Sequence, residues 1–358
     1  MSKIVIIGCG AVGASIAYEL SQVPQLNITV IDRQSPAQGC SSAALGVLMG
    51  AISQKVKGKA WQLRQRSIAR YETLIPEIEA ITGQKILFNQ QGILMLCLAG
   101  EDLTKWQELV EIRRVQGYNL EIWDLDQIST NCPQINLDKI TAAIYSPQDR
   151  QVDPTALTLA LVAAAQHNGV TFHFGVNVLE IEPKNCQVKT SNGQIDFDWL
   201  VLAAGLGSTD LTASLKNIVD IRPVLGQALH LRLEQPLGNA NFQPVITGND
   251  VHIVPVGEAD YWVGATVEFP VDGSEVVADA NQLEAVKQEA IAFCPALAKA
   301  MIKRSWLGLR PRPEGRPAPI IGNLPGFNNI LLATGHYRNG ILLAPATAQI
   351  IRELIIGN

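Results

Sequence analysis

The sequence has few charged residues, no basic excess and no paired cysteines, which argues against several classes of protein. Only 17% of its 358 residues are charged and the formal net charge is −5, so the chain lacks the basic excess that binding to a phosphate backbone requires. We therefore expect no nucleic-acid partner. The six cysteines are scattered and include no C-x-x-C pair, which favours reduced thiols over a zinc knuckle or a disulfide framework. Nothing in the sequence supports a metal site.

Long apolar runs are also missing. A glycine-rich turn follows one short apolar run at the amino end, which leaves no room for a signal peptide, and we expect no later window apolar enough to span a membrane. The protein is therefore predicted to be cytoplasmic, with no membrane partner. What the chain does have is length and a hydrophobic content of 47%, which predict two interlocked domains able to bury a large ligand.

The amino-terminal segment has the order of a dinucleotide-binding βαβ unit. The run KIVIIG predicts a buried parallel strand, and three glycines at G-x-G-x-x-G spacing lead into a helical pattern. Such a turn lets the backbone approach a pyrophosphate at the helix amino terminus, and the strand NITVID then ends in a carboxylate that can accept from a ribose hydroxyl. A purely structural turn is the alternative, and the motif does not separate NAD from FAD. The cofactor residues expected here are Gly8, Gly10, Ala11, Val12, Gly13, Asp32 and Arg33.

Two further segments favour a flavin over a nicotinamide. The loop GCSSAALGVLMGA (residues 39–51) places small side chains and two serine hydroxyls where backbone can lie along a cofactor, although a flexible loop would look the same. A buried strand at residues 198–208 runs into a second glycine turn. Long helices near residues 59–82 and 101–116 stand where a dehydrogenase would have its second mononucleotide half. The cofactor residues expected in the loop and the turn are Ser41, Ser42, Ala43, Ala44, Gly46, Ala204 and Gly205.

The ordered motifs together resemble the FAD-dependent D-amino-acid oxidase family, closest to its glycine oxidase branch. They are GCGAVG, GCSSAALG, VDPTAL, VLAAGLGS, RPVLGQ, VGATVE, GLRPRPEGRPAPIIG and GHYRNGILLAP, and they span essentially the whole chain. The resemblance implies an α/β fold (α+β overall) of the glutathione-reductase/D-amino-acid-oxidase type: a Rossmann-like FAD-binding domain with a mixed-sheet substrate domain. The expected division assigns residues 1–86, 140–222 and 318–358 to the first domain and residues 87–139 and 223–317 to the second.

In such a fold the carboxy-terminal segment GHYRNGILLAP passes the flavin. The helix that begins near Ile341 would aim its positive amino terminus at the part of the ring that becomes negative on reduction. An ordinary capped helix with Arg338 in solvent is the alternative, and Arg338 can serve either cofactor or substrate. The resemblance thus adds these cofactor residues: Val178, Gly335, His336, Arg338, Asn339, Gly340, Ile341 and Leu342. FAD is expected to be non-covalent, because the segments that tether it in relatives lack the cysteine or histidine here.

On the substrate side the resemblance assigns Arg310, after WLGL, to the substrate carboxylate, which a guanidinium can grip with two bonds. Arg312 and Arg316 lie in a turn-prone segment and are expected to face solvent. Strands at residues 249–256 and 261–269 are expected to form a hairpin that roofs the pocket. His252 stands where the branch tends to have tyrosine, so a structural role and a pocket-lining role are both open. Tyr337 and Arg338 complete the predicted catalytic set.

The predicted activity is oxidation of a small amino acid or amine, such as glycine, sarcosine or a small D-amino acid. Hydride would pass from Cα to flavin N5, the imine would give an oxo acid and ammonia, and dioxygen (O2) would reoxidise the flavin to yield hydrogen peroxide. Two alternatives stay open: a dehydrogenase that uses another acceptor, and a subunit that hands an imine to a thiazole synthase in thiamine biosynthesis. An NAD-dependent dehydrogenase is a more distant third. The sequence fixes neither the preferred amine nor the oligomeric state, and a homo-oligomer is compatible with it.

Overall fold

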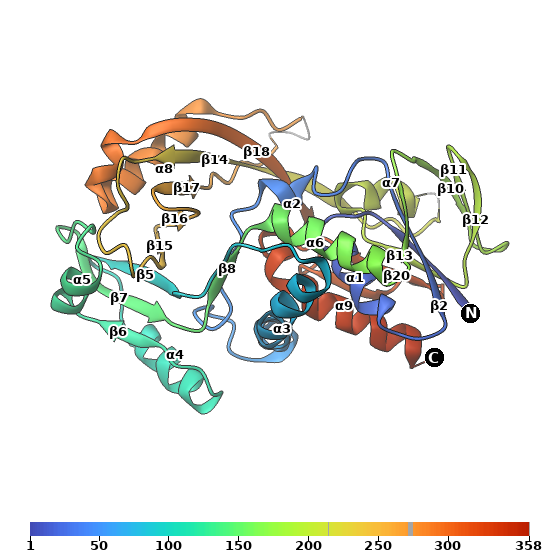
Figure 1. Ribbon diagram of the computed structural model, residues 1–358, viewed down its shortest axis with the longest axis horizontal. Helices are drawn as coiled ribbons and strands as arrows, with labels where there is room; N and C mark the ends of the chain where they lie inside the picture. The colour runs from blue at the N-terminus through green and yellow to red at the C-terminus, as the bar shows by residue number, and fades with distance from the viewer. Residues whose placement is uncertain (214, 271–274, 358) are drawn as a thin grey trace.

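The computed structural model describes residues 1–213, 215–270 and 275–357, and the two largest of their four β-sheets lie side by side (Figure 1). The first, which we call the parallel sheet, has six strands in the order β19-β20-β13-β1-β2-β9. All neighbours in it are parallel except the edge strand β19. The strands are β1 (Ser2–Ile7), β2 (Leu26–Asp32), β9 (Thr171–Phe174), β13 (Trp199–Leu202), β19 (Ile320–Asn323) and β20 (Ile330–Thr334).

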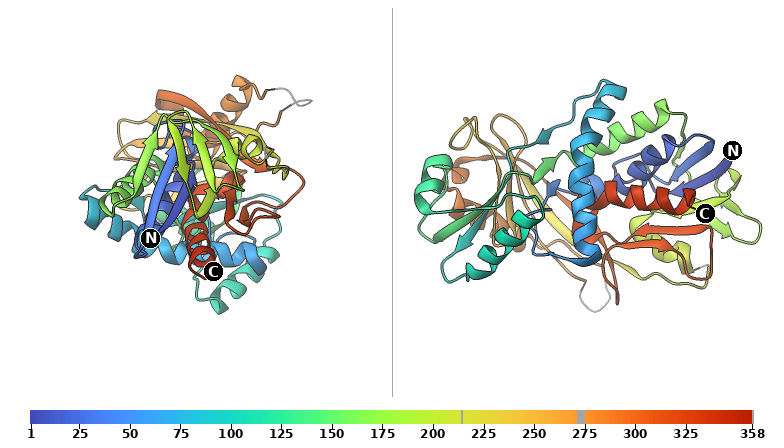
Figure 2. Two further views of the ribbon diagram at one scale, coloured as in Figure 1. Left: turned by 90° about the vertical axis from the view of Figure 1, so that its right-hand side faces the viewer. Right: turned by 90° about the horizontal axis from the view of Figure 1, so that it is seen from below.

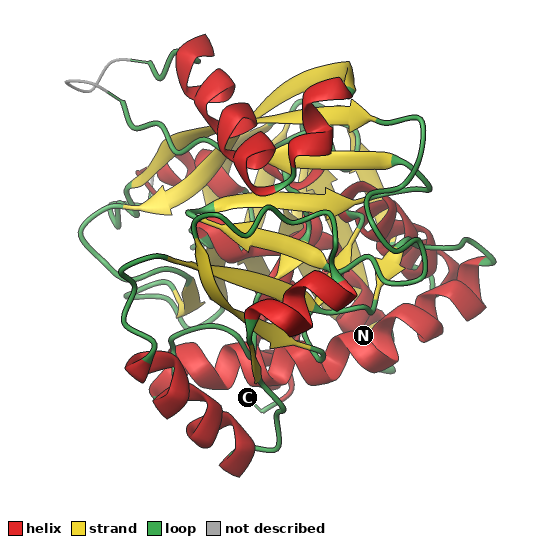
Figure 3. Cartoon of the chain, turned by 90° about the vertical axis from the view of Figure 1, so that its left-hand side faces the viewer, coloured by secondary structure: helices red, strands yellow, loops and turns green. Residues whose placement is uncertain are grey.

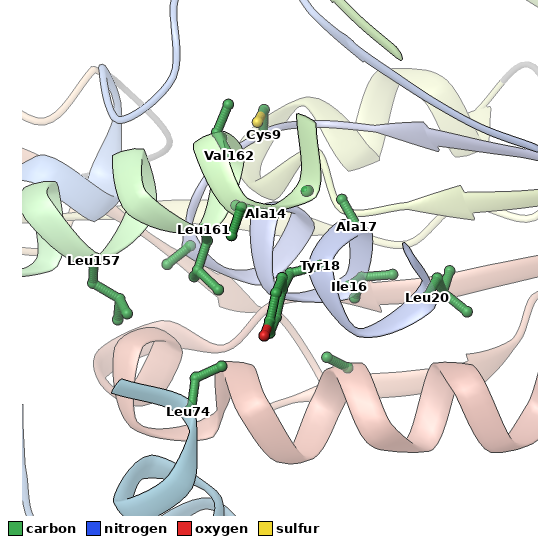
Figure 4. Packing of buried hydrophobic residues seen from close by; sticks show 14 of the residues in the cluster. Cys9, Ala14, Ile16, Ala17, Tyr18, Leu20, Leu74, Leu157, Leu161 and Val162 are labelled. Carbon is green, nitrogen blue, oxygen red and sulfur yellow. The ribbon is translucent and has the colours of Figure 1, made fainter. Parts of the chain in front are cut away.

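Alternate residues of β1 enter different cores, as expected for a strand buried on both faces. Ile4 and Ile6 belong to a cluster with the helices on one face, and Val5 and Ile7 to a cluster with an antiparallel meander on the other. The helices are α1 (Ala11–Ser21), α3 (Gly58–Thr82), α6 (Pro154–His167) and α9 (Gly340–Ile356), and the meander is β10 (Val178–Glu182), β11 (Gln187–Thr190) and β12 (Gly193–Asp196). Figure 4 shows side chains of α1 and α6 packed above α9.

The carboxy-terminal helix corrects one expectation. The window Tyr337–Ile356 is long and apolar enough to cross a membrane by length and composition, whereas the sequence was expected to contain no such window. Its apolarity has a structural reason, since 56% of the window is buried and α9 packs against α1 and α3. Figure 2 shows α9 lying along the parallel sheet, with α3 crossing between the two sheets.

The second sheet, which we call the mixed sheet, has eight strands in the order β18-β14-β17-β16-β15-β5-β7-β6 (Figures 1 and 3). Only the β15–β5 pair is parallel. The strands are β5 (Ile93–Leu98), β6 (Glu121–Trp123), β7 (Ile140–Ser146), β14 (Ile221–Arg232), β15 (Val245–Gly248), β16 (Val251–Pro255), β17 (Asp260–Gly264) and β18 (Met301–Pro313). Around it lie α4 (Thr104–Val115), α5 (Leu125–Asn131), α8 (Ala280–Phe293) and the 3-10 turn η2 (Pro295–Lys299).

Short elements connect the two sheets near the chain segments that the motifs singled out. A small sheet has the order β3-β8-β4, and two 3-10 turns precede α7 and α9. These elements are α2 (Cys40–Ala43), β3 (Val47–Leu48), β4 (Phe88–Asn89), β8 (Arg150–Val152), η1 (Gly205–Gly207), α7 (Ser208–Ala213) and η3 (Tyr337–Asn339). The fold class expected from the sequence is therefore confirmed.

Most expected elements form, with three differences. The two long helices and the β16–β17 hairpin lie where the sequence placed them. Residues 39–51, however, are not only a loop, because they contain α2 and β3. Arg312 lies within β18 and not in a turn, although its side chain is 39% exposed as expected for a solvent-facing residue and pairs with Glu314. β7 begins at the predicted boundary residue 140 but pairs with β5 and β6 in the mixed sheet, and the division into domains itself stays a prediction.

Candidate active site

A cavity of about 840 Å³ is lined by residues from both sheets. It follows the carboxyl ends of β1, β2 and β13, where ligands bind in open α/β sheets. It continues past α2 and η3 to β16 and β18. The cavity therefore joins the βαβ unit at the start of the chain to the helix at its end.

The glycine turn after β1 depends on the absence of side chains. Gly8 has φ 104°, and a Cβ there would lie 2.5 Å from the carbonyl oxygen of Ala203. A Cβ on Gly13 would lie 1.9 Å from the carbonyl oxygen of Gly8, so α1 approaches the turn as closely as backbone allows. The amide of Ala11 donates to Ser41 Oγ at 2.8 Å. Gly10, Ala11 and Val12 line the cavity at the amino end of α1, whose partial positive charge suits a pyrophosphate.

Asp32 closes the other side of this turn. Its Oδ2 accepts from the amide of Cys9 at 2.6 Å and its Oδ1 from the amide of Gln34 at 2.9 Å. Each carboxylate oxygen can accept more than one hydrogen bond, so the group keeps capacity for ribose hydroxyls in the cavity that it lines. The bonds to backbone fix its orientation before any ligand arrives.

Nearly all residues predicted from the sequence reach the cavity. The exceptions are Gly13, whose contact is with the Gly8 backbone, and Ser42, whose hydroxyl donates to the carbonyl of Gly39 at 3.0 Å. The predicted residues that do line it are Gly8, Gly10, Ala11, Val12, Asp32, Arg33, Ser41, Ala43, Ala44, Gly46, Val178, Ala204, Gly205, His252, Arg310, Gly335, His336, Tyr337, Arg338, Asn339, Gly340, Ile341 and Leu342. Sequence motifs that are remote in the chain thus meet in one place.

His336 shapes the turn before α9. The residue is only 3% exposed, and its Nε2 lies 2.9 Å from Oγ1 of Thr347, a buried residue of α9. Burial lowers the pKa of His336 to about 4. The imidazole is therefore neutral near pH 7 and acts as a fixed hydrogen-bonding group in the wall.

The buried His336 predicts a pH dependence of stability. The unfolded state takes up its proton near the ordinary pKa of about 6.5, whereas the folded state does so only near pH 4. The contribution of His336 to stability is therefore constant above about pH 6.5 and falls by about 3 kcal/mol as the pH drops from about 6.5 to about 4. Urea unfolding of His336→Gln across this range should show a shallower fall. The exposed His167→Gln serves as control and should leave the wild-type profile unchanged.

Arg310 lies on β18, and one nitrogen of its guanidinium is hydrogen-bonded to backbone carbonyl groups. Its Nη1 donates to the carbonyl oxygens of Leu225 at 3.1 Å and Thr266 at 2.9 Å. A Cβ on Gly226 would come within 2.2 Å of the guanidinium, so this glycine makes room for it. Burial, and then the nearby Arg338, lower the pKa of Arg310. An arginine stays charged in such a setting, so the group is a strong binding site for a carboxylate.

Two other predicted residues face the same part of the cavity. Arg338 Nη2 pairs with Asp250 Oδ1 at 3.1 Å, and the arginine side chain is 36% exposed, so this ion pair stands at the rim. His252 on β16 has a buried Nδ1 without a hydrogen-bond partner in the described part of the chain. Burial, followed by the charge of Arg338, lowers the pKa of His252 to about 4. It is therefore a neutral group of the pocket wall at neutral pH.

One wall of the cavity was missed in the sequence. It includes residues that lie outside the motifs identified in the sequence: Ile52, Ser53, Gln54, Arg64, Met95 and Trp106. Their placement depends on contacts between segments that are distant in sequence. Neither a motif nor a periodicity in this chain predicts those contacts.

Two buried charges brace the part of this wall that follows Gly50. The carboxylate of Asp149 accepts from the amides of Gly50, Ala51 and Ile52, each at 2.8 Å. Arg113, stacked 3.6 Å over Trp61, donates to carbonyl oxygens of the same segment: those of Ala51, Ser53 and Lys55. The segment is thus held through its backbone from both sides, and its side chains are free to face the cavity.

The fold and the site define the class. The chain belongs to the D-amino-acid oxidase family of FAD-dependent oxidoreductases, because the family described as FAD dependent oxidoreductase matches residues 3–354. The residues present fit FAD: uncapped helix termini, the oriented Asp32 carboxylate and a turn without side chains surround one cavity long enough to join them. FAD is therefore the cofactor of this fold.

Individual relatives within the family show which of its members this chain is similar to. The chain is 30% identical over 356 residues to the glycine oxidase of Bacillus subtilis, covering 98% of this chain and 92% of that protein. It is 32% identical over 357 residues to the bifunctional protein ThiO/ThiG of Nostoc sp., covering 99% of this chain but only 52% of that protein, so it spans about half the length of such relatives. The crystal structure of glycine oxidase from Geobacillus kaustophilus superposes with a TM-score of 0.90 at 26% identity, covering 100% of this chain and 96% of that one.

Proposed function

We propose that the protein oxidises a small amino acid or amine, with glycine, sarcosine and small D-amino acids as the first substrates to test. The observation that carries the proposal is Arg310: a charged guanidinium held by two carbonyl oxygens at the cavity wall, with Arg338 near it. Such a group selects a carboxylate. The similarity to glycine oxidases over nearly the whole chain supports an amino acid as the ligand.

Bound FAD supplies the acceptor for the hydride that leaves Cα. Arg310 binds the substrate carboxylate and so fixes where Cα lies. His252, neutral because its pKa is lowered to about 4, adds no positive charge beside the substrate amine. The partly apolar cavity favours the neutral amine, since burial disfavours a charged ammonium. The imine product then hydrolyses to an oxo acid and ammonia in water, and dioxygen takes up the electrons to give hydrogen peroxide.

A second candidate function is supply of the imine to a thiazole synthase. The observation that favours it is the similarity to the bifunctional protein ThiO/ThiG, which is 32% identical over 99% of this chain. We further propose that the protein is cytoplasmic and has the domain division given above. Its small-molecule partners would be dioxygen and the amine. Size-exclusion chromatography of the purified protein shows whether it forms a homo-oligomer.

The test uses the purified protein as expressed. We expect a yellow protein that releases its cofactor into the supernatant on acid precipitation, and anaerobic loss of flavin colour on addition of glycine, sarcosine or a small D-amino acid. Peroxide formed in air, compared with reduction of an artificial dye, distinguishes an oxidase from a dehydrogenase. A protein that holds FAD but is bleached by none of these amines would refute the proposed substrate class, and a coloured pellet would refute non-covalent binding.

A further inference from the structure

Arg64 in α3 is a cavity-lining cation whose one acidic neighbour in the described residues, Asp149, lies beyond ion-pair distance and already accepts from three backbone amides. Its Nη1 donates to the carbonyl of Ala60 in its own helix at 3.0 Å, and its Nη2 lies 3.4 Å from Asn339 Oδ1. Its Nε is buried without a hydrogen-bond partner, and Arg64 forms no ion pair within the described residues. A half-buried guanidinium in this state is poorly compensated and attracts a negative charge that enters the cavity.

The contact with Asn339 matters because Asn339 is the N-cap residue of α9. Asparagine at this position normally accepts a hydrogen bond from an amide of the first helical turn. Here the side chain makes no such bond, and its oxygen faces Arg64 instead. The amides of Gly340, Ile341 and Leu342 therefore remain without a side-chain cap where they line the cavity. Arg64 thus adds its own charge to the helix end and keeps the competing acceptor away from it.

The amino end of α9 also lies near Arg310, the residue proposed to bind the substrate carboxylate. Arg338 and Tyr337, which precede α9, lie close enough to Arg310 to influence it electrostatically. A substrate bound by Arg310 must meet the reducible ring of FAD, so the ring belongs in this part of the cavity and not beside Asp32. A flavin gains negative charge on reduction, and a fixed cation nearby stabilises the reduced form relative to the oxidised form.

We propose that Arg64 is a positioning and electrostatic residue that raises the reduction potential of the bound FAD, jointly with the amino end of α9. The inference rests on the proposed function, since it takes the FAD ring to lie between Arg310 and α9. It assigns a role to a residue that no motif of the sequence marked. The balance of the reaction is unchanged: Arg64 neither gives nor takes a proton, and it stabilises the electron pair once the substrate has supplied it.

The test compares FAD-loaded Arg64→Gln and Arg64→Lys with the wild type. The two-electron midpoint potential is measured by equilibration with a reference dye, and sodium sulfite affinity is measured by loss of flavin absorbance. We expect Arg64→Gln to shift the reduction equilibrium at least tenfold toward oxidised FAD, equal to about 30 mV, and to weaken sulfite binding by a similar factor. Arg64→Lys should stay within threefold of the wild type.

The matched control is Arg66→Gln on the same helix. Arg66 pairs with Glu353 at 2.7 Å and does not line the cavity, so its loss should leave potential and sulfite affinity unchanged. An unchanged potential in Arg64→Gln, or a lysine variant shifted as far as the glutamine variant, would overturn the inference. If Arg64→Gln does not fold, Arg64→Met gives the same comparison. A wild-type protein that holds FAD but oxidises no amine would refute the proposed function and leave the role of Arg64 testable. The reduction potential and the sulfite affinity are both measured without substrate.

Discussion

Replacing Arg310 with alanine should raise the dissociation constant of the amino acid substrate about thirtyfold or more. Removing one partner of a buried, hydrogen-bonded charge pair costs about 2 to 5 kcal/mol, and every 1.4 kcal/mol is about a factor of ten. The side chain is anchored by the carbonyls of Leu225 and Thr266, and the neighbouring cation Arg338 is already paired with Asp250. The measurement is the concentration dependence of anaerobic flavin bleaching by glycine. Arg310→Lys should recover only part of the affinity, because lysine cannot form two parallel bonds to a carboxylate.

The control for this experiment lies two residues along the same strand. Arg312 pairs with Glu314 at 3.2 Å and stays outside the cavity, so Arg312→Ala should bind substrate as the wild type does. The visible spectrum of each variant shows whether FAD is retained. Unchanged bleaching in an Arg310→Ala protein that keeps its FAD spectrum would refute the anchoring role.

Replacing Gly13 with alanine should abolish tight FAD binding and lower the free energy of unfolding by about 3 kcal/mol, the upper end for overpacking. The new Cβ would lie 1.9 Å from the carbonyl oxygen of Gly8, and that atom belongs to backbone that cannot rotate away. Either α1 moves from the strand or the turn opens. Both changes shift the helix amides that line the cavity. FAD affinity of the apoprotein and urea unfolding measure the two effects separately.

A glycine with free space gives the comparison for Gly13→Ala. At Gly257 the nearest atom to an added Cβ is Asp260 Cβ at 3.5 Å, which is ordinary contact, and the residue does not line the cavity. Gly257→Ala should therefore keep both FAD affinity and stability within experimental error. A Gly13→Ala protein that binds FAD as tightly as Gly257→Ala would show that close packing of α1 on the turn is not required.

Much of this site follows from local sequence. A β-branched strand, a glycine turn and a helix of mainly small and apolar residues specify the βαβ unit over about thirty residues, and Gly8, Gly10 and Asp32 lie where that unit needs them. Arg310 was marked by its place after an apolar run together with the resemblance to a family. A helix beginning near Ile341 was likewise expected, and α9 begins at Gly340, but its burial against two other helices was not expected. The βαβ unit is short-range, so neighbouring residues in the sequence suffice to predict it.

Residue type and spacing alone decided the glycine turn and the aspartate after the second strand, because each depends on backbone geometry within a few residues, whereas the family resemblance was needed to mark the cation on β18. Tertiary structure decided the rest. Whether Ser41 or Ser42 faces the cavity depends on how α2 meets α1, and Arg64 has a role only because α3 crosses to the beginning of α9. Such contacts join residues up to 275 positions apart, and their energy comes from burial shared between elements that no single segment encodes.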